Sequence, residues 1–323
     1  MNENPISEKP KKSLSFSEYS TYISCPHKWY LNYYCRFPGD VSEELLFGSS
    51  LHNTIESIFT NKMILRLYRM NKERTIQDVF VDCLKKELER VEDTAFLQNF
   101  AGRKLAPIFL FQARDLILKL DFERKFKDYE IVHVEFKLDG LPIHEQDEFV
   151  LTYKGFVDLI LKHKVTGKYL ILDWKTSRKA WDIKKKMADN PDLFAQLCLY
   201  KHFYSHVSGV DMDKIDTKYY NFPRDEADKQ SFYTGILNKT YVDTFFNQFK
   251  NVAIKIYQHS QSLKEFDKAK HTTPKNFCFR CKYNTPDLCS DDEQHQFVAK
   301  PEPKENPLQK DSEPFQKDVE IPD

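Results

Sequence analysis

Two aspartates and a lysine in neighbouring hydrophobic segments have the types and spacing of a hydrolytic metal site. Asp158 interrupts the apolar run GFVDLI, and Asp173 and Lys175 stand in the next such run, ILDWKT. Side chains alternate along a strand, so Asp173 and Lys175 share one face while Trp174 points to the other. If the two runs pair as a hairpin, Asp158 lies beside Asp173. Two carboxylates on one face offer oxygen ligands to a hard cation such as Mg²⁺ or Mn²⁺.

A lysine beside such a cation could orient or activate the attacking water and balance phosphate charge, which is the chemistry of phosphodiester hydrolysis. Burying both carboxylates without a cation is costly, because like charges a few ångström apart do not both ionise readily. The alternative is an Asp–Lys pair on a solvated strand end, since the D-x-K tripeptide is frequent by chance. The position of Asp158 among apolar residues favours the metal site.

The cysteines offer a second metal centre. Cys278 and Cys281 form a C-x2-C pair, Cys289 follows, and Cys25 in a Ser-Cys-Pro segment is the best candidate for a fourth ligand. Two kinds of centre fit this pattern: structural zinc, which the spacing alone favours, and an iron–sulfur cluster with four thiolates. The other three cysteines lie in helical, partly apolar stretches and are predicted to pack as small hydrophobic residues: Cys35, Cys83 and Cys198.

Hydrophobic periodicity predicts the elements that must position these residues. Residues 16–128 have helical spacing. Runs rich in β-branched and aromatic residues then predict three consecutive strands, expected to be antiparallel, and Gly167 suits the turn between the last two. In chain order the prediction is strands at 129–138, 149–163 and 168–176, a helix at about 192–206, a strand at about 217–222 and a helix at about 241–263.

Composition excludes several classes of protein. Only 8 of the 323 residues are glycine, and no two have the spacing of GxGxxG or GxxxxGK[ST]. A standard dinucleotide-binding fold and a P-loop motor are therefore excluded. No run of about 18 apolar residues is present, so no membrane span is expected. The start, MNENPISEKPKKS, lacks the apolar stretch of a signal peptide, so we expect a cytoplasmic protein with reduced cysteines.

The neutral total charge hides an asymmetry. Residues 291–323 hold ten acidic and four basic side chains and five prolines, whereas the rest of the chain has a net charge of +6. A segment with so few aliphatic residues cannot offset its ordering entropy, so it is predicted to be a disordered acidic tail. Residues 1–13 are predicted to be a flexible leader. The basic body suits a polyanionic partner.

Together these pieces resemble the PD-(D/E)XK superfamily, and within it the RecB/AddB-like nucleases with an iron–sulfur staple, such as the CRISPR-associated RecB-like exonucleases. Each motif is weak alone, and their order over about residues 15–290 carries the resemblance. The spacing from Cys281 to Cys289 departs from the family, because it is longer than the usual gap. The matching segments are the first-cysteine helix SFSEYSTYISCPHKWY (15–30), the Gly-x-x-x-His motif FGSSLHNTI (47–55), the strands GFVD (155–158) and ILDWKT (171–176), the Gln-x-x-x-Tyr helix QLCLY (196–200) and the cysteine cluster (278–289).

The resemblance implies roles for particular residues. His52, Asp158 and Asp173 would bind Mg²⁺ or Mn²⁺, helped by the backbone carbonyl of Trp174. Lys175 would act on the nucleophilic water or the scissile phosphate. The remaining implied roles are catalytic support and DNA contact for Gln196 and Tyr200, a supporting role beside the metal ligands for Glu135, and ligation of a [4Fe-4S] cluster, with structural Zn²⁺ as the alternative, by Cys25, Cys278, Cys281 and Cys289.

The resemblance also implies an α/β (α+β) fold of the restriction-endonuclease type, with a mixed central sheet flanked by helices and a helical N-terminal region. The expected organisation is a leader at 1–13, a nuclease domain at 14–290 and an acidic tail at 291–323. The nuclease domain would comprise a helical part at 14–128, a catalytic core at 129–265 and the cysteine cluster at 266–290.

The expected activity is that of a metal-dependent DNA exonuclease, acting on single-stranded DNA or free ends in recombination, repair or phage DNA metabolism. Two alternatives are a flap or branched-DNA endonuclease of the same superfamily and a non-catalytic DNA-binding recombination accessory protein. A zinc-stapled RNA-binding module would explain the cysteines but not the D-x-K strand. The chain has no helicase segment, so a helicase or recombination partner would act in trans.

Overall fold

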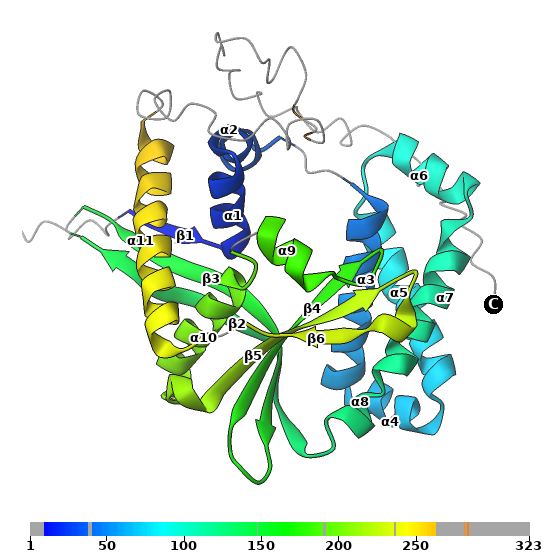
Figure 1. Ribbon diagram of the computed structural model, residues 1–323. Coiled ribbons are helices and arrows are strands. Elements are labelled where there is room, and N and C mark those ends of the chain that lie inside the picture. Colours follow the sequence, from blue (N-terminus) through cyan, green and yellow to red (C-terminus); the bar gives the residue numbers. More distant parts are fainter. Residues whose placement is uncertain are drawn as a thin grey trace, which may run out of the picture. The chain divides into compact units, whose positions relative to one another are not determined.

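The computed structural model of the chain describes residues 10–37, 41–146, 148–189, 192–235, 237–262, 281 and 283 (Figure 1). The contacts among these residues divide them into two compact units, and each is described by itself. The first unit contains residues 10–37, 139–146, 148–154, 247–262, 281 and 283, and the second contains residues 41–138, 155–189, 192–235 and 237–246.

The first unit begins with a strand, β1 (Lys11–Leu14), which pairs parallel with residues 150–153. The predicted flexible leader is therefore wrong at its end, because three of its residues belong to the sheet. Helix α1 (Phe16–Ser24) follows, capped by the Ser15 hydroxyl, which accepts from the Glu18 N–H at 3.1 Å. A short helix and a π-helical turn complete the N-terminal part: α2 (Pro26–Trp29) and η1 (Tyr30–Tyr34).

The second unit opens with consecutive helices, as the helical spacing predicts. Asparagines separate the early ones: Asn61 accepts hydrogen bonds from the Met63 and Ile64 N–H groups, and Asn71 accepts from the Arg74 N–H, so each caps the next helix. No helix in the described part of the chain is long and apolar enough to cross a membrane. The helices are α3 (Glu43–Thr60), α4 (Lys62–Met70), α5 (Lys72–Glu89), α6 (Thr94–Gly102), α7 (Leu105–Leu120) and α8 (Phe122–Lys125).

A mixed sheet follows these helices. The chain order gives β2 (Tyr129–Glu145), β3 (Val150–His163), β4 (Tyr169–Ser177), β5 (Ile215–Pro223) and β6 (Ser231–Tyr233). Strand β3 pairs with β2 and β4, and the sheet continues through β5 to β6. The β3–β4 and β5–β6 pairs are antiparallel, whereas β4 and β5 are parallel. The predicted α/β fold with a mixed sheet flanked by helices is therefore confirmed.

The observed elements differ from the predicted ones mainly where they are short. The turn before β4 contains Gly167 with φ +67°, as its predicted role requires. Strand β6 and the seven-residue helix α9 (Ile183–Asp189) were not predicted, because such short segments give no clear periodicity. The last two predicted helices are present as α10 (Ala195–Ser208) and α11 (Lys239–Gln261).

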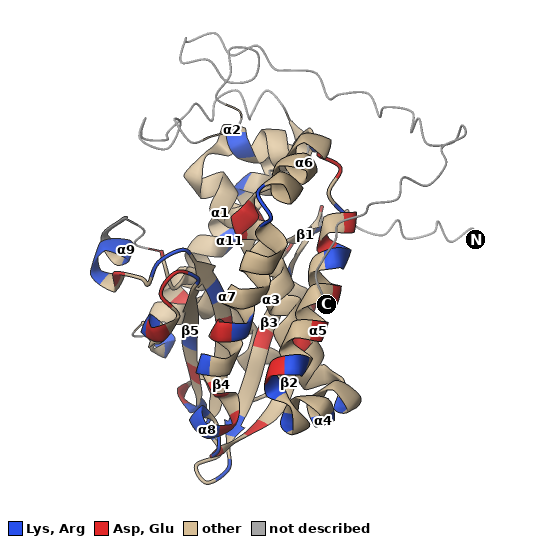
Figure 2. Cartoon of the chain, turned by 90° about the vertical axis from the view of Figure 1, so that its right-hand side faces the viewer, with Lys and Arg blue, Asp and Glu red and all other residues tan. Residues whose placement is uncertain are grey.

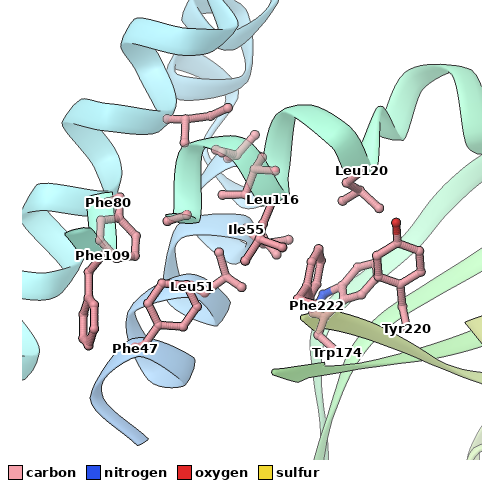
Figure 3. Close-up of a cluster of buried hydrophobic side chains, with 14 of the residues drawn as sticks. Phe47, Leu51, Ile55, Phe80, Phe109, Leu116, Leu120, Trp174, Tyr220 and Phe222 are labelled. Carbon is pink, nitrogen blue, oxygen red and sulfur yellow. The ribbon is translucent and has the colours of Figure 1, made fainter. Parts of the chain in front are cut away.

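Charged residues lie along the helices of the second unit (Figure 2). Apolar residues fill its interior. Helices α3, α5 and α7 form one buried apolar cluster, which Trp174, Tyr220 and Phe222 of β4 and β5 join (Figure 3). Burying each large apolar side chain contributes about 1.5–3 kcal/mol. Helix α10 contacts the same two strands, and its Gln196 reaches the lysine of the D-x-K segment. The α10 side of the sheet therefore combines buried apolar residues with the polar groups around the D-x-K segment.

Candidate active site

The end of the β3–β4 ladder brings the two predicted aspartates together. Residues 159–162 of β3 pair with residues 169–172 of β4, so Asp158 and Asp173 come next in register, as the hairpin prediction requires. At this point the Asp158 Oδ2 atom accepts a hydrogen bond from the Trp174 backbone N–H. A carboxylate thus takes the place of a strand carbonyl, and the regular ladder stops where the site begins.

His52 reaches the same place from α3. Its Nδ1 atom lies 3.8 Å from Asp158 Oδ1, and its side chain is 28% exposed. Burial and the positive charge of Lys175 lower the pKa of His52 to about 4, although a backbone hydrogen bond at Trp174 opposes this shift. The imidazole is therefore neutral at pH 7, which is the protonation state that a metal ligand requires.

Gly48 lets α3 approach β4 closely enough for this contact. A Cβ atom at Gly48 would lie 2.9 Å from the Thr176 Oγ1 atom, closer than real Cβ contacts. The glycine stands four residues before His52, so both lie on one side of the helix, next to β4 and the aspartates. The Gly-x-x-x-His spacing therefore has a physical reason in this chain.

Lys175 is held between its own strand and α10. Its Nζ atom lies 2.6 Å from Asp173 Oδ2 and donates to Gln196 Oε1 at 2.9 Å. Gln196 donates from Nε2 to the Tyr200 hydroxyl at 2.7 Å. The Gln-x-x-x-Tyr helix therefore fixes the ammonium group beside the aspartates, and the structure brings these predicted residues together.

Glu135 enters the site from β2 through an unusual backbone conformation. Its φ of +49° is in the left-handed region, which is rare for a non-glycine residue inside a strand. Its carboxyl group hydrogen-bonds Asp158. Burial and the charges of Glu56 and Asp173 raise the pKa of Glu135 to about 7. Glu56, four residues after His52, thus adds acidity that the sequence analysis did not assign to the site.

Burial makes the carboxylates of the site unusually hard to ionise. The Asp158 and Asp173 side chains are 12% and 3% exposed. Burial and then the charge of Asp173 raise the pKa of Asp158 well above its ordinary value. Burial also raises the pKa of Asp173, although Lys175 opposes the shift. The site therefore concentrates more negative groups than its single lysine neutralises.

An open pocket of about 440 Å³ adjoins these residues. Its wall combines predicted site residues with polar groups of α3 and α5, and Arg90 pairs with Glu87 at 2.7 Å at its α5 side. The sequence alone gave no signal for the α5 residues, because an Arg–Glu pair three apart is common on helix surfaces. The lining residues are Glu44, Leu45, Gly48, Ser49, His52, Asn53, Glu87, Arg90, Glu135, Asp158 and Thr176.

The carboxylates of Asp158 and Asp173 and the imidazole of His52 are donor groups that suit a hard divalent cation. Buried carboxylates with raised pKa values and a neutral imidazole would be stabilised in their ligating forms by a nearby positive charge. Within the described residues, no three His, Cys, Asp or Glu side chains are already arranged to hold an ion.

The predicted cysteine centre is described only in part. Cys278 and Cys289 lie outside the described residues, whereas Cys25 and Cys281 are half-buried in the first unit. Tyr283 donates a hydrogen bond to Asn32 Oδ1, which joins the chain just after Cys281 to the turn after Cys25. The other three cysteines are at most 5% exposed, as predicted: Cys35, Cys83 and Cys198.

Comparisons with known proteins identify a family match and a similar solved structure. A solved structure that is similar to the chain is the crystal structure of a protein named "Putative exonuclease" from Eubacterium rectale, at 12% identity and a TM-score of 0.45, covering 77% of this chain and 81% of that one. No curated protein matches the chain. The family model of the PD-(D/E)XK nuclease superfamily matches residues 13–286 of the 323. The chain therefore belongs to the PD-(D/E)XK nuclease superfamily.

Proposed function

We propose that this nuclease is a metal-dependent DNA exonuclease that acts on single strands or free ends. The observation that carries the proposal is the convergence of Asp158, Asp173, Lys175 and His52 at one end of the β3–β4 ladder. The superfamily supports hydrolysis of phosphodiester bonds. The ordered motifs that resemble RecB-like exonucleases support the preference for ends, and with it a role in recombination, repair or phage DNA metabolism.

The residues have separable tasks in this reaction. Asp158, Asp173 and His52 would hold Mg²⁺ or Mn²⁺, which when bound polarises the scissile phosphate and lowers the pKa of an attacking water. Lys175 places a fixed positive charge where negative charge develops on the phosphate. Gln196 holds the Lys175 ammonium by a 2.9 Å hydrogen bond, so the lysine needs little rearrangement when the substrate arrives.

Digestion of end-labelled DNA tests the proposal. Single-stranded DNA labelled at the 5′ or the 3′ end is incubated with the wild type or Lys175→Ala in Mg²⁺ or Mn²⁺. We expect the wild type to shorten linear DNA progressively from an end and the variant to be inactive. The position of the label that is released first gives the polarity of cleavage.

Circular single-stranded DNA separates the proposal from its alternatives. An exonuclease leaves circles intact, whereas an endonuclease opens them, so cleavage of circles would replace this proposal by the endonuclease. Binding of DNA without any cleavage in either metal would favour the non-catalytic accessory protein. An RNA strand of the same sequence, run in parallel, shows whether the enzyme requires a deoxyribose backbone.

We also propose that Cys25, Cys278, Cys281 and Cys289 hold a [4Fe-4S] cluster that joins distant parts of the chain. The hydrogen bond from Tyr283 to Asn32 supports this, because it joins residues 251 apart beside two of the cysteines. Iron content and visible absorbance should be lost in Cys25→Ser and kept in Cys35→Ser, whose thiol is buried elsewhere in the same unit. Zinc in place of iron in anaerobically purified wild type would establish the structural-zinc alternative.

A further inference from the structure

The segment between β4 and α10 is rich in lysine and arginine and passes close to the catalytic lysine. It includes Trp181 and the short helix α9, whose first turn is capped by Asp182: the Asp182 Oδ1 atom accepts from the Lys185 N–H at 3.1 Å. In Figure 2 part of the α9 ribbon has the colour of Lys and Arg. Lys184 and Lys185 are exposed, whereas Lys186 is half-buried. One lysine of the three is therefore directed differently from its neighbours.

Lys186 and Lys175 lie on two aromatic rings that contact each other. The Lys175 Nζ atom lies 5.2 Å from the Tyr219 ring centroid, and the Lys186 Nζ atom lies 4.3 Å from that of Trp181. The two rings meet edge to face, with centroids 5.8 Å apart. The contacts thus run from Lys175 through the Tyr219 and Trp181 rings to Lys186. The two aromatic rings in contact therefore each hold one lysine ammonium group.

Tyr233 of β6 holds Trp181 in place. The Tyr233 hydroxyl of β6 donates to the Trp181 carbonyl at 3.0 Å, and the two rings pack with centroids 5.3 Å apart. Tyr219 is itself anchored, because its hydroxyl donates to the Leu193 carbonyl at 3.0 Å. A lysine on such a supported ring loses less side-chain entropy when it binds a ligand than a free surface lysine does.

The charges around Lys186 are unbalanced. Within the described chain no carboxylate pairs with it, in contrast to Lys175, which pairs with Asp173. Burial, and then the charge of Lys175, lower the pKa of Lys186. An ammonium group without an acidic partner is stabilised when an anion binds beside it. Since the substrate of a nuclease is a chain of phosphates, the substrate can supply that anion.

We propose that Lys186 is a second substrate-binding cation, which contacts a backbone phosphate of the bound strand beside the one held at Lys175, and that Trp181 positions it. This inference rests on the proposed function, because it places the substrate of that same site. A lysine ammonium is a compact point charge that suits a phosphate contact without base specificity. The strand would then extend from the metal site along β4 toward α9.

Steady-state cleavage of a labelled single-stranded oligonucleotide tests the role of Lys186. Lys186→Ala should raise KM about tenfold, the effect of losing one charge-assisted hydrogen bond, and change kcat much less. Lys186→Arg should restore most of the affinity. Lys185→Ala is the matched control, since it removes the same charge from the adjacent, exposed position, and it should leave KM within about twofold. Equal KM values for Lys186→Ala and Lys185→Ala would overturn the proposal, as would a change confined to kcat.

Binding without cleavage provides a second readout. In the absence of divalent metal, the logarithm of the dissociation constant for the oligonucleotide is measured against the logarithm of the salt concentration. Loss of one phosphate contact should reduce the slope by about 0.7 in Lys186→Ala and leave it unchanged in Lys185→Ala. An unchanged slope in Lys186→Ala would overturn the proposal.

The positioning role of Trp181 is tested by two replacements. Trp181→Phe keeps a ring under the ammonium and should keep KM near the wild-type value, whereas Trp181→Leu should raise KM as Lys186→Ala does. Equal KM values for the two Trp181 variants, at equal thermal stability, would contradict the positioning role. If the wild type neither binds nor cleaves nucleic acid, the proposed function itself fails, whereas normal cleavage with unaffected Lys186→Ala defeats only this inference.

Discussion

The two faces of β4 and β5 carry different side chains in the second half of each nine-residue strand. On one face Trp174, Tyr220 and Phe222 pack against α3 and α7. On the other face Asp173 and Lys175 meet the polar residues of α10. Paired residues of β4 and β5 lie on the same face of the sheet, as Trp174 does beside Tyr220 and Lys175 beside Asn221.

The apolar face is stabilised chiefly by burial, so its residues contribute through buried area and close packing. The polar face is held by specific partners. Asn221 shows this, because its fully buried side chain donates to the Lys175 carbonyl at 3.2 Å and to the Ser177 hydroxyl at 2.8 Å. Burial of the Asp173 carboxylate lowers the stability of the fold. Substitutions on the polar face should therefore change cleavage, whereas substitutions on the apolar face should change the free energy of unfolding.

The largest expected effect is the loss of catalysis from the polar face. Asp173→Asn removes a predicted metal ligand and the partner of Lys175, so cleavage should fall on the order of a thousandfold or more. The fold should survive, because the amide has the same size and relieves a buried carboxylate whose pKa is raised by burial. Cleavage rates and urea unfolding measure the two effects. Unfolding of the variant at 25 °C would contradict the separation of the two faces.

The opposite outcome is expected one residue later, on the apolar face. Trp174 is 3% exposed and packs edge to face on Tyr220, with centroids 5.7 Å apart. Trp174→Ala should lower the free energy of unfolding by about 3–5 kcal/mol, because it leaves a cavity in the core. Trp174→Phe should cost much less and retain cleavage. A Trp174→Ala protein as stable as the wild type in urea would show that this face is not a packed core.

Much of this contrast is predictable from the sequence. The alternation of ILDWKT places Asp173 and Lys175 opposite Trp174, and the apolar surroundings of Asp158 set it apart from ordinary surface acids. These local patterns fix which side chains share a face. The family resemblance added His52, Gln196 and Tyr200, which no spacing rule connects with the aspartates, and the structure brings all three to the site.

Other features of the site were beyond sequence reasoning. Glu135 reaches Asp158 through a positive φ that a non-glycine residue does not signal in advance. Lys186 looks like its two neighbours in the sequence, and only the placement of Trp181 against Tyr219 sets it apart. The short strand β1 was assigned to a flexible leader, because four residues give no usable period and the pairing partner lies more than 130 residues away.

A smaller effect on stability and cleavage is expected where α3 packs against β4. Gly48→Ala would force a Cβ atom against Thr176 Oγ1 at 2.9 Å, so we expect a loss of about 1–3 kcal/mol in the free energy of unfolding and reduced cleavage. Adding Thr176→Ala should recover part of the stability. Gly102→Ala is the control, because a Cβ atom there meets nothing within 4 Å. Equal stability of Gly48→Ala and Gly102→Ala would show that α3 can shift away from β4 freely.

The smallest expected effect concerns pH and the helix that covers the polar face. In α10, His202 stacks on Phe246 with centroids 3.8 Å apart, and burial lowers the pKa of His202 to about 4. A histidine in the unfolded chain has its ordinary pKa near 6.5 and binds a proton first as the pH falls. This residue therefore contributes stability above about pH 6.5 that is lost progressively as the pH falls toward 4.

His202→Phe keeps the stacked ring and removes the titration. The wild type should lose more unfolding free energy than the variant between pH 7 and pH 5, as measured by urea denaturation at both values. Phe222 of the buried apolar cluster has no titrating group, so Phe222→Leu should lower stability equally at the two pH values. If His202→Phe and the wild type lost the same unfolding free energy on acidification, the acid sensitivity would come from groups other than His202. The packing of α10 would then not differ from that of the apolar cluster in its response to pH.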